Sequence, residues 1–181
     1  MTSPDISAEE AARTGQKHYR EERWSEAAAA FQRAEQAYRD HGSKLDAAEM
    51  ANNRAVALIQ DDAPEKALEA IEGTPELFLE AQDEQRAAQA FGNRASALEA
   101  LGRVQEATTA YQRAAELFNQ LGDTDSRLHT YQAISRLQLR QGQTLEALTT
   151  YQRGLPGQGR LPWKQRLLRW LLSLPSRLLD S

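Results

Sequence analysis

The sequence contains no cysteine among its 181 residues, which excludes disulfides and leaves the redox compartment open. It also lacks any run of about 18 apolar residues, so no segment has the composition of a membrane-spanning helix. The first ten residues, MTSPDISAEE, have neither the basic segment nor the apolar run of a signal peptide. We therefore expect a soluble globular or solenoid chain located in the cytoplasm.

Positive charge is scarce in most of the chain. The net charge is −4, yet residues 160–181 hold five basic residues and one acidic residue, a local charge of +4 that leaves −8 for the rest. A body this acidic repels nucleic acid, which we exclude as a partner. Only the C-terminal segment could attract an anionic surface.

The sequence shows no recognisable catalytic or metal-binding pattern. The three histidines, His18, His41 and His129, fall in different parts of the chain without ligand-spaced partners. No strand pattern and no glycine-rich phosphate loop occurs, and the acidic runs are typical of solvated helix faces. We therefore predict no catalytic residue, no metal, no cofactor and no small-molecule substrate, and conclude that the chain is not an enzyme.

What the sequence does contain is a repeat of 40 residues. Four segments align without gaps: ERWSEAAAAFQRAEQAY, DAPEKALEAIEGTPELF, GRVQEATTAYQRAAELF and GQTLEALTTYQRGLPGQ. One position of this alignment is alanine throughout, at Ala27, Ala67, Ala107 and Ala147. Four residues later come Phe31, Ile71, Tyr111 and Tyr151. This regularity indicates four copies of one supersecondary unit.

Each copy has the pattern of a helical hairpin. Spacings of three and four place the repeated residues on one helix face, and a second such pattern precedes them, as in MANNRAVALIQ. A single hairpin cannot bury its apolar face, so the units must stack. We predict an all-α fold, an α-solenoid of four helical hairpins plus a C-terminal amphipathic helix.

The predicted domain boundaries follow from this alignment. Residues 1–7 are a flexible N-terminus, and residues 8–155 form the array, with units at about 8–42, 45–82, 84–122 and 125–154. A Gly/Pro linker at 156–162 leads to a basic amphipathic helix at 163–181.

Turn residues fall at regular places in these units. The hairpin turns are expected at Asp62, Gly102 and Gly142, with Glu22 as a less typical substitute in the first unit. Gly42 and Gly122 are expected to cap second helices in a left-handed conformation. The second unit contains EGTPELF, where a proline cannot continue a helix, so we predict a break at residues 73–75.

The repeats resemble the tetratricopeptide repeat (TPR). RTGQKHYREERWSEAAAAFQRA and GNRASALEALGRVQEATTAYQRA match its order of small and aromatic residues. The resemblance covers about residues 8–155. The period of 40 exceeds the usual period of about 34, and is similar to the long-helix variants in kinesin light chain and regulators of the MalT type.

The resemblance implies that the first helices of the hairpins line a concave groove that binds peptides or partner domains. NNRA and GNRA place Asn53 and Asn93 where chaperone-binding repeats supply the asparagine of a carboxylate clamp. The lysines and the arginine of that clamp are missing, because one register offers Ala12 and Gln89, and the next His129 and Ala133. We therefore do not expect recognition of an EEVD-type tail.

A row of polar residues is nevertheless expected to face this groove and to pair with the backbone of an extended peptide. The candidate groove residues are Asn52, Asn53, Gln89, Asn93, Ser96, Gln132 and Arg136. The alternative is that some of them only cap or solvate helices. Arg54 and Arg94 repeat with the same period, and we expect them to pair with acids of a neighbouring hairpin.

The segment LPWKQRLLRWLLSLPSRLL, residues 161–179, differs from the repeats in being basic and rich in leucine. A helix from Trp163 to Leu174 would be about 18 Å long, too short to span a bilayer. Three roles remain open: a packed cap on the solenoid, an anchor on an anionic membrane surface, or a docking element for another protein. The candidate contact residues are Trp163, Arg166, Leu167, Arg169, Trp170, Leu171 and Leu174.

The sequence thus predicts a non-catalytic scaffold that binds a protein or peptide in its groove. The alternative is a tethering or assembly factor peripheral to the membrane, for which the C-terminal helix is the functional element. A third, weaker hypothesis is a peptide-sensing regulatory module.

Overall fold

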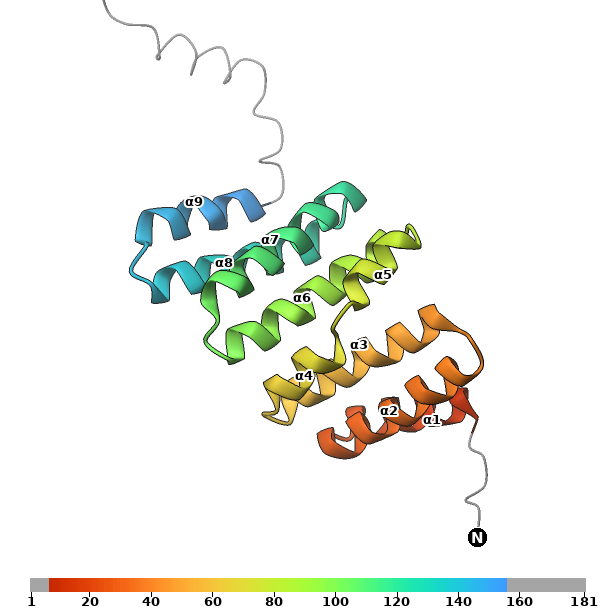
Figure 1. The fold of residues 1–181 in the computed structure, drawn as a ribbon. Coiled ribbons are helices and arrows are strands. Elements are labelled where there is room, and N and C mark those ends of the chain that lie inside the picture. The colour runs from red at the N-terminus through yellow and green to blue at the C-terminus, as the bar shows by residue number, and fades with distance from the viewer. Residues whose placement is uncertain (1–6, 156–181) are drawn as a thin grey trace, which may run out of the picture.

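The computed structural model describes residues 7–155, which form nine helices in four stacked hairpins (Figure 1). The hairpins comprise α1 (Ala8–Arg20) and α2 (Trp24–Asp40); α3 (Lys44–Gln60), α4 (Pro64–Ala70) and α5 (Thr74–Glu80); α6 (Glu84–Ala100) and α7 (Val104–Leu121); and α8 (Thr124–Arg140) and α9 (Thr144–Gly154). Within this range there is no strand, and the predicted all-α solenoid is confirmed. Residues 1–6 of the predicted N-terminal segment 1–7, the predicted linker and the predicted C-terminal helix lie outside the described residues.

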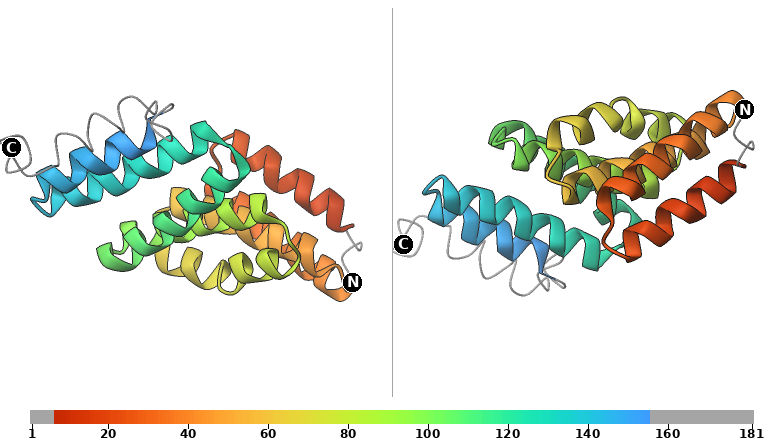
Figure 2. Two further views of the ribbon diagram at one scale, coloured as in Figure 1. Left: turned by 90° about the horizontal axis from the view of Figure 1, so that it is seen from above. Right: turned by 90° about the horizontal axis from the view of Figure 1, so that it is seen from below.

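Each helix packs mainly against its neighbours in sequence. Helix α2 contacts both α1 and α3, and α7 contacts both α6 and α8, so the second helix of one hairpin joins it to the next. The views from above and below show the first and last hairpins pointing in different directions, so the stack twists along its length (Figure 2). Such stacking buries the apolar faces that a lone hairpin would expose.

The turns recur at intervals of 20 residues. A residue with positive φ ends each of seven helix segments: Glu22, Gly42, Asp62, Gln82, Gly102, Gly122 and Gly142. In each turn the residue after the one with positive φ donates its backbone N–H to the carbonyl five residues earlier. Examples are Arg23 to His18 and Gln143 to Gln138, both at 2.9 Å. This is the Schellman motif, which satisfies the last carbonyls of a helix. The turns and left-handed caps expected from the sequence are confirmed, and Gln82 is an additional one.

The second helix of hairpin two is broken where the sequence predicts it. Helix α4 ends at Ala70, and Gly73 has a φ of 70°, a backbone conformation that a side chain would strain. Pro75 then lies in the first turn of α5, where its missing N–H costs nothing. Helix α5 still packs against both α3 and α6, so the break bends the hairpin without interrupting the stack.

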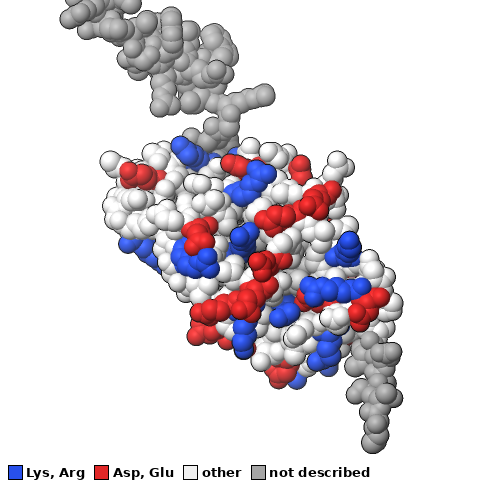
Figure 3. All heavy atoms as spheres, in the orientation of Figure 1, with Lys and Arg blue, Asp and Glu red and all other residues white. Residues whose placement is uncertain are grey.

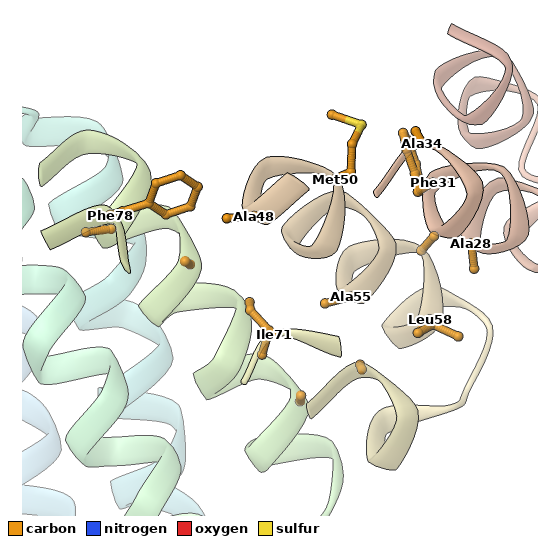
Figure 4. Close-up of a cluster of buried hydrophobic side chains, with 14 of the residues drawn as sticks. Ala28, Phe31, Ala34, Ala48, Met50, Ala55, Leu58, Ile71 and Phe78 are labelled. Atoms are coloured by element: carbon orange, nitrogen blue, oxygen red, sulfur yellow. The ribbon is translucent and has the colours of Figure 1, made fainter. Parts of the chain in front are cut away.

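The core is built from alanines at close helix contacts and larger side chains between hairpins. The repeated alanines at 27, 67, 107 and 147 are at most 1% exposed. Figure 4 shows Phe31, Leu58, Ile71 and Phe78 filling the space between successive helices. Small residues let the helix backbones approach, and the larger ones exclude water between the layers.

Ion pairs connect the hairpins at their edges. Arg54 donates to Glu35 of the preceding hairpin at 3.1 Å, and Arg94 donates to Glu76 at 3.3 Å. The expected structural pairing of these two arginines is therefore confirmed. Glu35 is also paired with Arg39. Acidic and basic side chains are interspersed over the face drawn in Figure 3.

Candidate functional site

The first helices of hairpins two, three and four, together with Phe118 of α7, line a depression of about 420 Å³. Its lining residues are Asn52, Asn53, Val56, Gln89, Gly92, Asn93, Phe118, Ser126, His129 and Thr130. A second depression, of about 330 Å³, lies between hairpins one and two and is lined by Gln16, Tyr19, Arg20, Phe31, Asn53 and Val56. The two depressions share Asn53 and Val56, so they adjoin at α3. Together they extend over all four hairpins and are called the groove.

The groove crosses the first helices obliquely. When every position is reduced to its place in the 40-residue repeat, the lining moves about one helical turn per hairpin. It comprises residues 16–20 on α1, 52–56 on α3, 89–93 on α6 and 126–130 on α8. A twisted stack has this consequence, because a straight line across rotated helices meets each at a different height. The structure therefore gathers residues that do not share one repeat position.

Side-chain amides form the polar part of this groove. Nδ2 of Asn93 donates to Oδ1 of Asn52 at 2.9 Å, which links α6 to α3. Asn52 is only 9% exposed, whereas Asn53 and Asn93 are half-buried and Gln89 is exposed. An amide carries two donor hydrogens and two acceptor lone pairs, so the bond between Asn93 and Asn52 leaves both kinds of group for a ligand.

Gly92 lies in the floor of the groove without any need from packing. A Cβ at this position would meet nothing within 4 Å. Gly15, also inside a helix, is different, because a Cβ there would lie 2.7 Å from the ring of Phe31. Glycine within a helix costs roughly 0.5–1 kcal/mol relative to alanine. Packing explains that cost at Gly15, whereas no contact within the described residues requires glycine at Gly92.

The first depression contains no Lys, Arg, Asp or Glu side chain. In the second, Arg20 is the single charged lining residue, beside Tyr19 and Phe31. Val56 and Phe118 provide apolar surface among the amides. The first depression therefore suits a ligand with a polar backbone and uncharged side chains, and it has no Lys or Arg that could form a carboxylate clamp.

The structure brings together only part of the residues predicted from the sequence. Asn52, Asn53, Gln89 and Asn93 line the groove. Ser96 instead donates to the carbonyl of Gly92 at 3.0 Å and lies 3.1 Å from the hydroxyl of Tyr111.

On α8 the lining comes from residues 126–130, whereas Gln132 is half-buried and Arg136 is exposed elsewhere on the helix. The predicted C-terminal contacts at residues 163–174 lie outside the described part of the chain.

Tyr111 is the centre of a polar contact behind the groove. Its hydroxyl donates to Glu99 at 3.0 Å, and Glu99 also accepts from Arg140 of hairpin four at 3.1 Å. Burial, together with the neighbouring carboxylate of Glu99, raises the pKa of Tyr111 to about 12 against the opposing hydrogen bond of Ser96. Through Glu99, this contact links hairpin three to Arg140 of hairpin four.

Sequence reasoning missed Gly92, Val56, Phe118, Ser126 and Thr130 as lining residues. One signal was available: Gly92 is a glycine in the middle of a helical pattern with no turn to make. The others result from the oblique course of the groove, which depends on the twist between hairpins.

Two kinds of feature are absent from residues 7–155. No helix in this range has the length and apolarity to cross a membrane. Nor does this part of the chain gather three His, Asp or Glu side chains that could hold a metal ion.

Stacked helical hairpins with a groove along their first helices define the class of helical-repeat proteins, to which this chain belongs. Residues 5–155 match the family described as "Soluble NSF attachment protein, SNAP", and the chain is a member of that family. The predicted TPR-like architecture is thus supported, and the family assignment becomes more specific. No curated protein matches this sequence.

Among solved structures, the chain is similar to RapI in its apo form. The TM-score is 0.75 at 18% sequence identity, over 85% of this chain and 56% of RapI. At this identity the likeness shows the fold. The chain spans little more than half the length of that protein.

Proposed function

We propose that this chain is a non-catalytic interaction scaffold that binds an extended peptide segment of a partner protein in the oblique groove. The observation that carries the proposal is the combination of paired amides with a glycine floor. Asn52 and Asn93 present donors and acceptors over Gly92, and an extended peptide offers the matching N–H and C=O groups.

The lining favours particular ligand chemistry. Because the first depression has no Lys, Arg, Asp or Glu side chain, recognition of the peptide rests on backbone hydrogen bonds and on apolar contacts with Val56 and Phe118. Arg20 at the end formed by hairpin one favours an acidic group on that side of the ligand. The body's charge of −8 disfavours nucleic acid, so the proposed ligand is a peptide.

The family supports the general role. Its description names an attachment protein, and we propose an interaction role for this chain without a particular partner. We place the activity in the cytoplasm, as expected from the sequence.

The direct test is selection of peptides from a random displayed library on the full chain. Selected peptides would be synthesised and their affinity measured by fluorescence polarisation. Replacing Asn53 and Asn93 with alanine removes two hydrogen-bonding groups, each worth about 1 kcal/mol, so affinity should fall at least about fivefold per site.

The matched control replaces two amides that occupy one repeat position on second helices, Gln32→Ala and Gln112→Ala, which are exposed on α2 and α7. These should leave affinity unchanged. If the asparagine and glutamine variants bind alike, or if selection yields no peptide, the groove proposal is wrong. Far-UV circular dichroism would check that all variants keep their helix content.

A further inference from the structure

The fourth hairpin carries large apolar side chains that no described residue covers. Leu145 is 77% exposed, Leu148 55% and Leu139 53%, and Tyr151 is 40% exposed. Leu145, Leu148 and Tyr151 succeed one another at a spacing of three, so they form a stripe along α9. This stripe, together with Leu139 at the end of α8, forms the terminal face.

The repeat shows which of these exposures is unusual. The residues equivalent to Tyr151 are Phe31, Ile71 and Tyr111, and each is at most 7% exposed because the next hairpin covers it. The residues equivalent to Leu145 are Ser25, Glu65 and Gln105, which are exposed and polar. Hairpin four therefore has leucine where the other hairpins have water-facing polar residues. This is the composition of a surface that something covers.

The segment after α9 continues the register of the first helices. Adding 40 to α8, which spans 124–140, gives 164–180 for the next first helix. Three positions buried in both α3 and α6, at 47, 48 and 50 and at 87, 88 and 90, correspond to Leu167, Leu168 and Trp170. Exposed positions at 44 and 84 correspond to Lys164, and the exposed Gln89 corresponds to Arg169. From residue 164 to residue 170, apolar and polar residues thus fall where a packed first helix needs them. The match ends at Pro175 and Arg177, whose equivalents in α3, α6 and α8 are buried.

The glycines and prolines that precede this segment do not prevent such packing. Hairpin two breaks its second helix at residues 71–73, before Pro75, and its stack continues. Gly154 and Pro156 are at nearly the same repeat position in hairpin four. Seven residues, 156–162, span up to about 24 Å when extended, which exceeds the roughly 16 Å length of the 11-residue α9. The segment can therefore turn back along α9.

We propose that the leucine-rich side of residues 164–179 docks antiparallel on the terminal face and closes the solenoid as an incomplete fifth hairpin. Leu167, Trp170 and Leu171 then lie toward α9, and the arginines at 166 and 169 form the water-facing side that a terminal cap requires. Pro175 ends regular helix at about residue 174 and leaves the last leucines to cover the start of α9. This proposal does not depend on peptide binding in the groove.

Cysteine cross-linking in the full chain tests the proposal, since the natural sequence has no thiol. One cysteine replaces Tyr151, and a second replaces one residue of the C-terminal segment. A short bismaleimide then joins the two thiols, and the rate is measured on denaturing gels. The second sites on the leucine side are Leu167, Leu171 and Leu174. The matched sites on the polar side are Arg166, Arg169 and Ser173.

A docked segment gives cross-linking several-fold faster at the leucine-side sites than at the neighbouring polar-side sites. If the segment is only tethered and does not dock, thiols on its leucine side and its polar side have the same effective concentration near Tyr151→Cys. Equal cross-linking rates would therefore overturn the proposal. Products of dimer mass would assign the terminal face to a second copy. A side preference that appears only with vesicles of anionic phospholipid would assign the segment to a membrane surface. Both of these outcomes also contradict docking.

Because Tyr151 is itself part of the terminal face, a second measurement leaves it intact. Leu148→Gln and Leu171→Gln are made singly and together, and unfolding is measured in urea. If the two leucines touch, the double variant loses less stability than the sum of the single losses. Additive losses would count against docking, and Arg169→Gln serves as the control on the polar side.

Discussion

Hairpins three and four have the same register, but they bury their equivalent residues to different extents. Tyr111 of α7 is 7% exposed and shares a core cluster with residues of α8, whereas Tyr151 at the same position of α9 is 40% exposed. The carboxylate of Glu99 in hairpin three is paired with Arg140, and its equivalent in hairpin four is Leu139. The exposure of a second-helix side chain in this array thus depends on whether a further helix packs on its hairpin. The last described hairpin has the apolar surface that would suit such a helix.

The largest expected effect concerns the two tyrosines. Tyr111→Ala leaves a cavity and removes the bond to Glu99, so it should lower the free energy of unfolding by about 3 kcal/mol. Tyr151→Ala should cost about 2 kcal/mol if the C-terminal segment covers it, and under about 0.5 kcal/mol if the surface is bare. Urea denaturation of the full chain measures both. A loss at position 151 within error of zero would mean that hairpin four ends in water.

The second prediction concerns the repeat position filled by Ala114 in hairpin three and by Gly154 in hairpin four. A Cβ at residue 154 would lie 2.8 Å from Cβ of Tyr131, so α8 and α9 approach too closely for alanine. Gly154→Ala should therefore destabilise the protein by roughly 1–3 kcal/mol, although alanine is buried at the equivalent position 114. Thermal unfolding monitored by circular dichroism checks this. An unchanged melting temperature would show that the two hairpins pack alike.

The third prediction uses the raised pKa of Tyr111, about 12 against an ordinary value of 10. Since the folded state binds this proton more tightly, its stabilising contribution is complete below pH 10 and is lost as pH rises through 12. Compared with Tyr111→Phe, the wild type should lose about 1–2 kcal/mol more stability between pH 10 and 12. Parallel pH profiles of the two proteins would contradict the burial of the Tyr111 hydroxyl.

The smallest effect is expected at Gly92, whose counterpart in hairpin four is Gln132. Gly92→Ala meets no neighbour and improves helix propensity, so it should raise the free energy of unfolding by roughly 0.5–1 kcal/mol. Gly15→Ala is the control, because the ring of Phe31 leaves no room there. Destabilisation by Gly92→Ala would mean that packing requires this glycine after all.

The fold was predictable because its signals are local and repeated. Alanines and aromatic residues 40 residues apart define the hairpins, and Gly73 with Pro75 defines the break in the second. The turn at Gln82 was not predicted because its side chain gives no turn signal. Its place 20 residues after Asp62 would have identified it.

The groove was predictable only in its centre. Asn53 and Asn93 are on the two middle hairpins, where the line of the groove stays close to the repeat position chosen from the sequence. They therefore line the groove as predicted. Gln132 and Arg136 were chosen as if each hairpin contributed the same repeat position. The twist of the stack moves the lining about one turn per hairpin, and this angle arises from packing between helices that are distant in sequence.

The central claim is that the floor of the groove at Gly92 receives a peptide backbone. The most direct measurement is calorimetric titration of a selected peptide into the wild type and Gly92→Leu, with Gln112→Leu on exposed α7 surface as the control. The account predicts that Gly92→Leu weakens binding at least about tenfold, or 1.4 kcal/mol, while the protein remains folded. An affinity equal to that of the wild type and the control would contradict it.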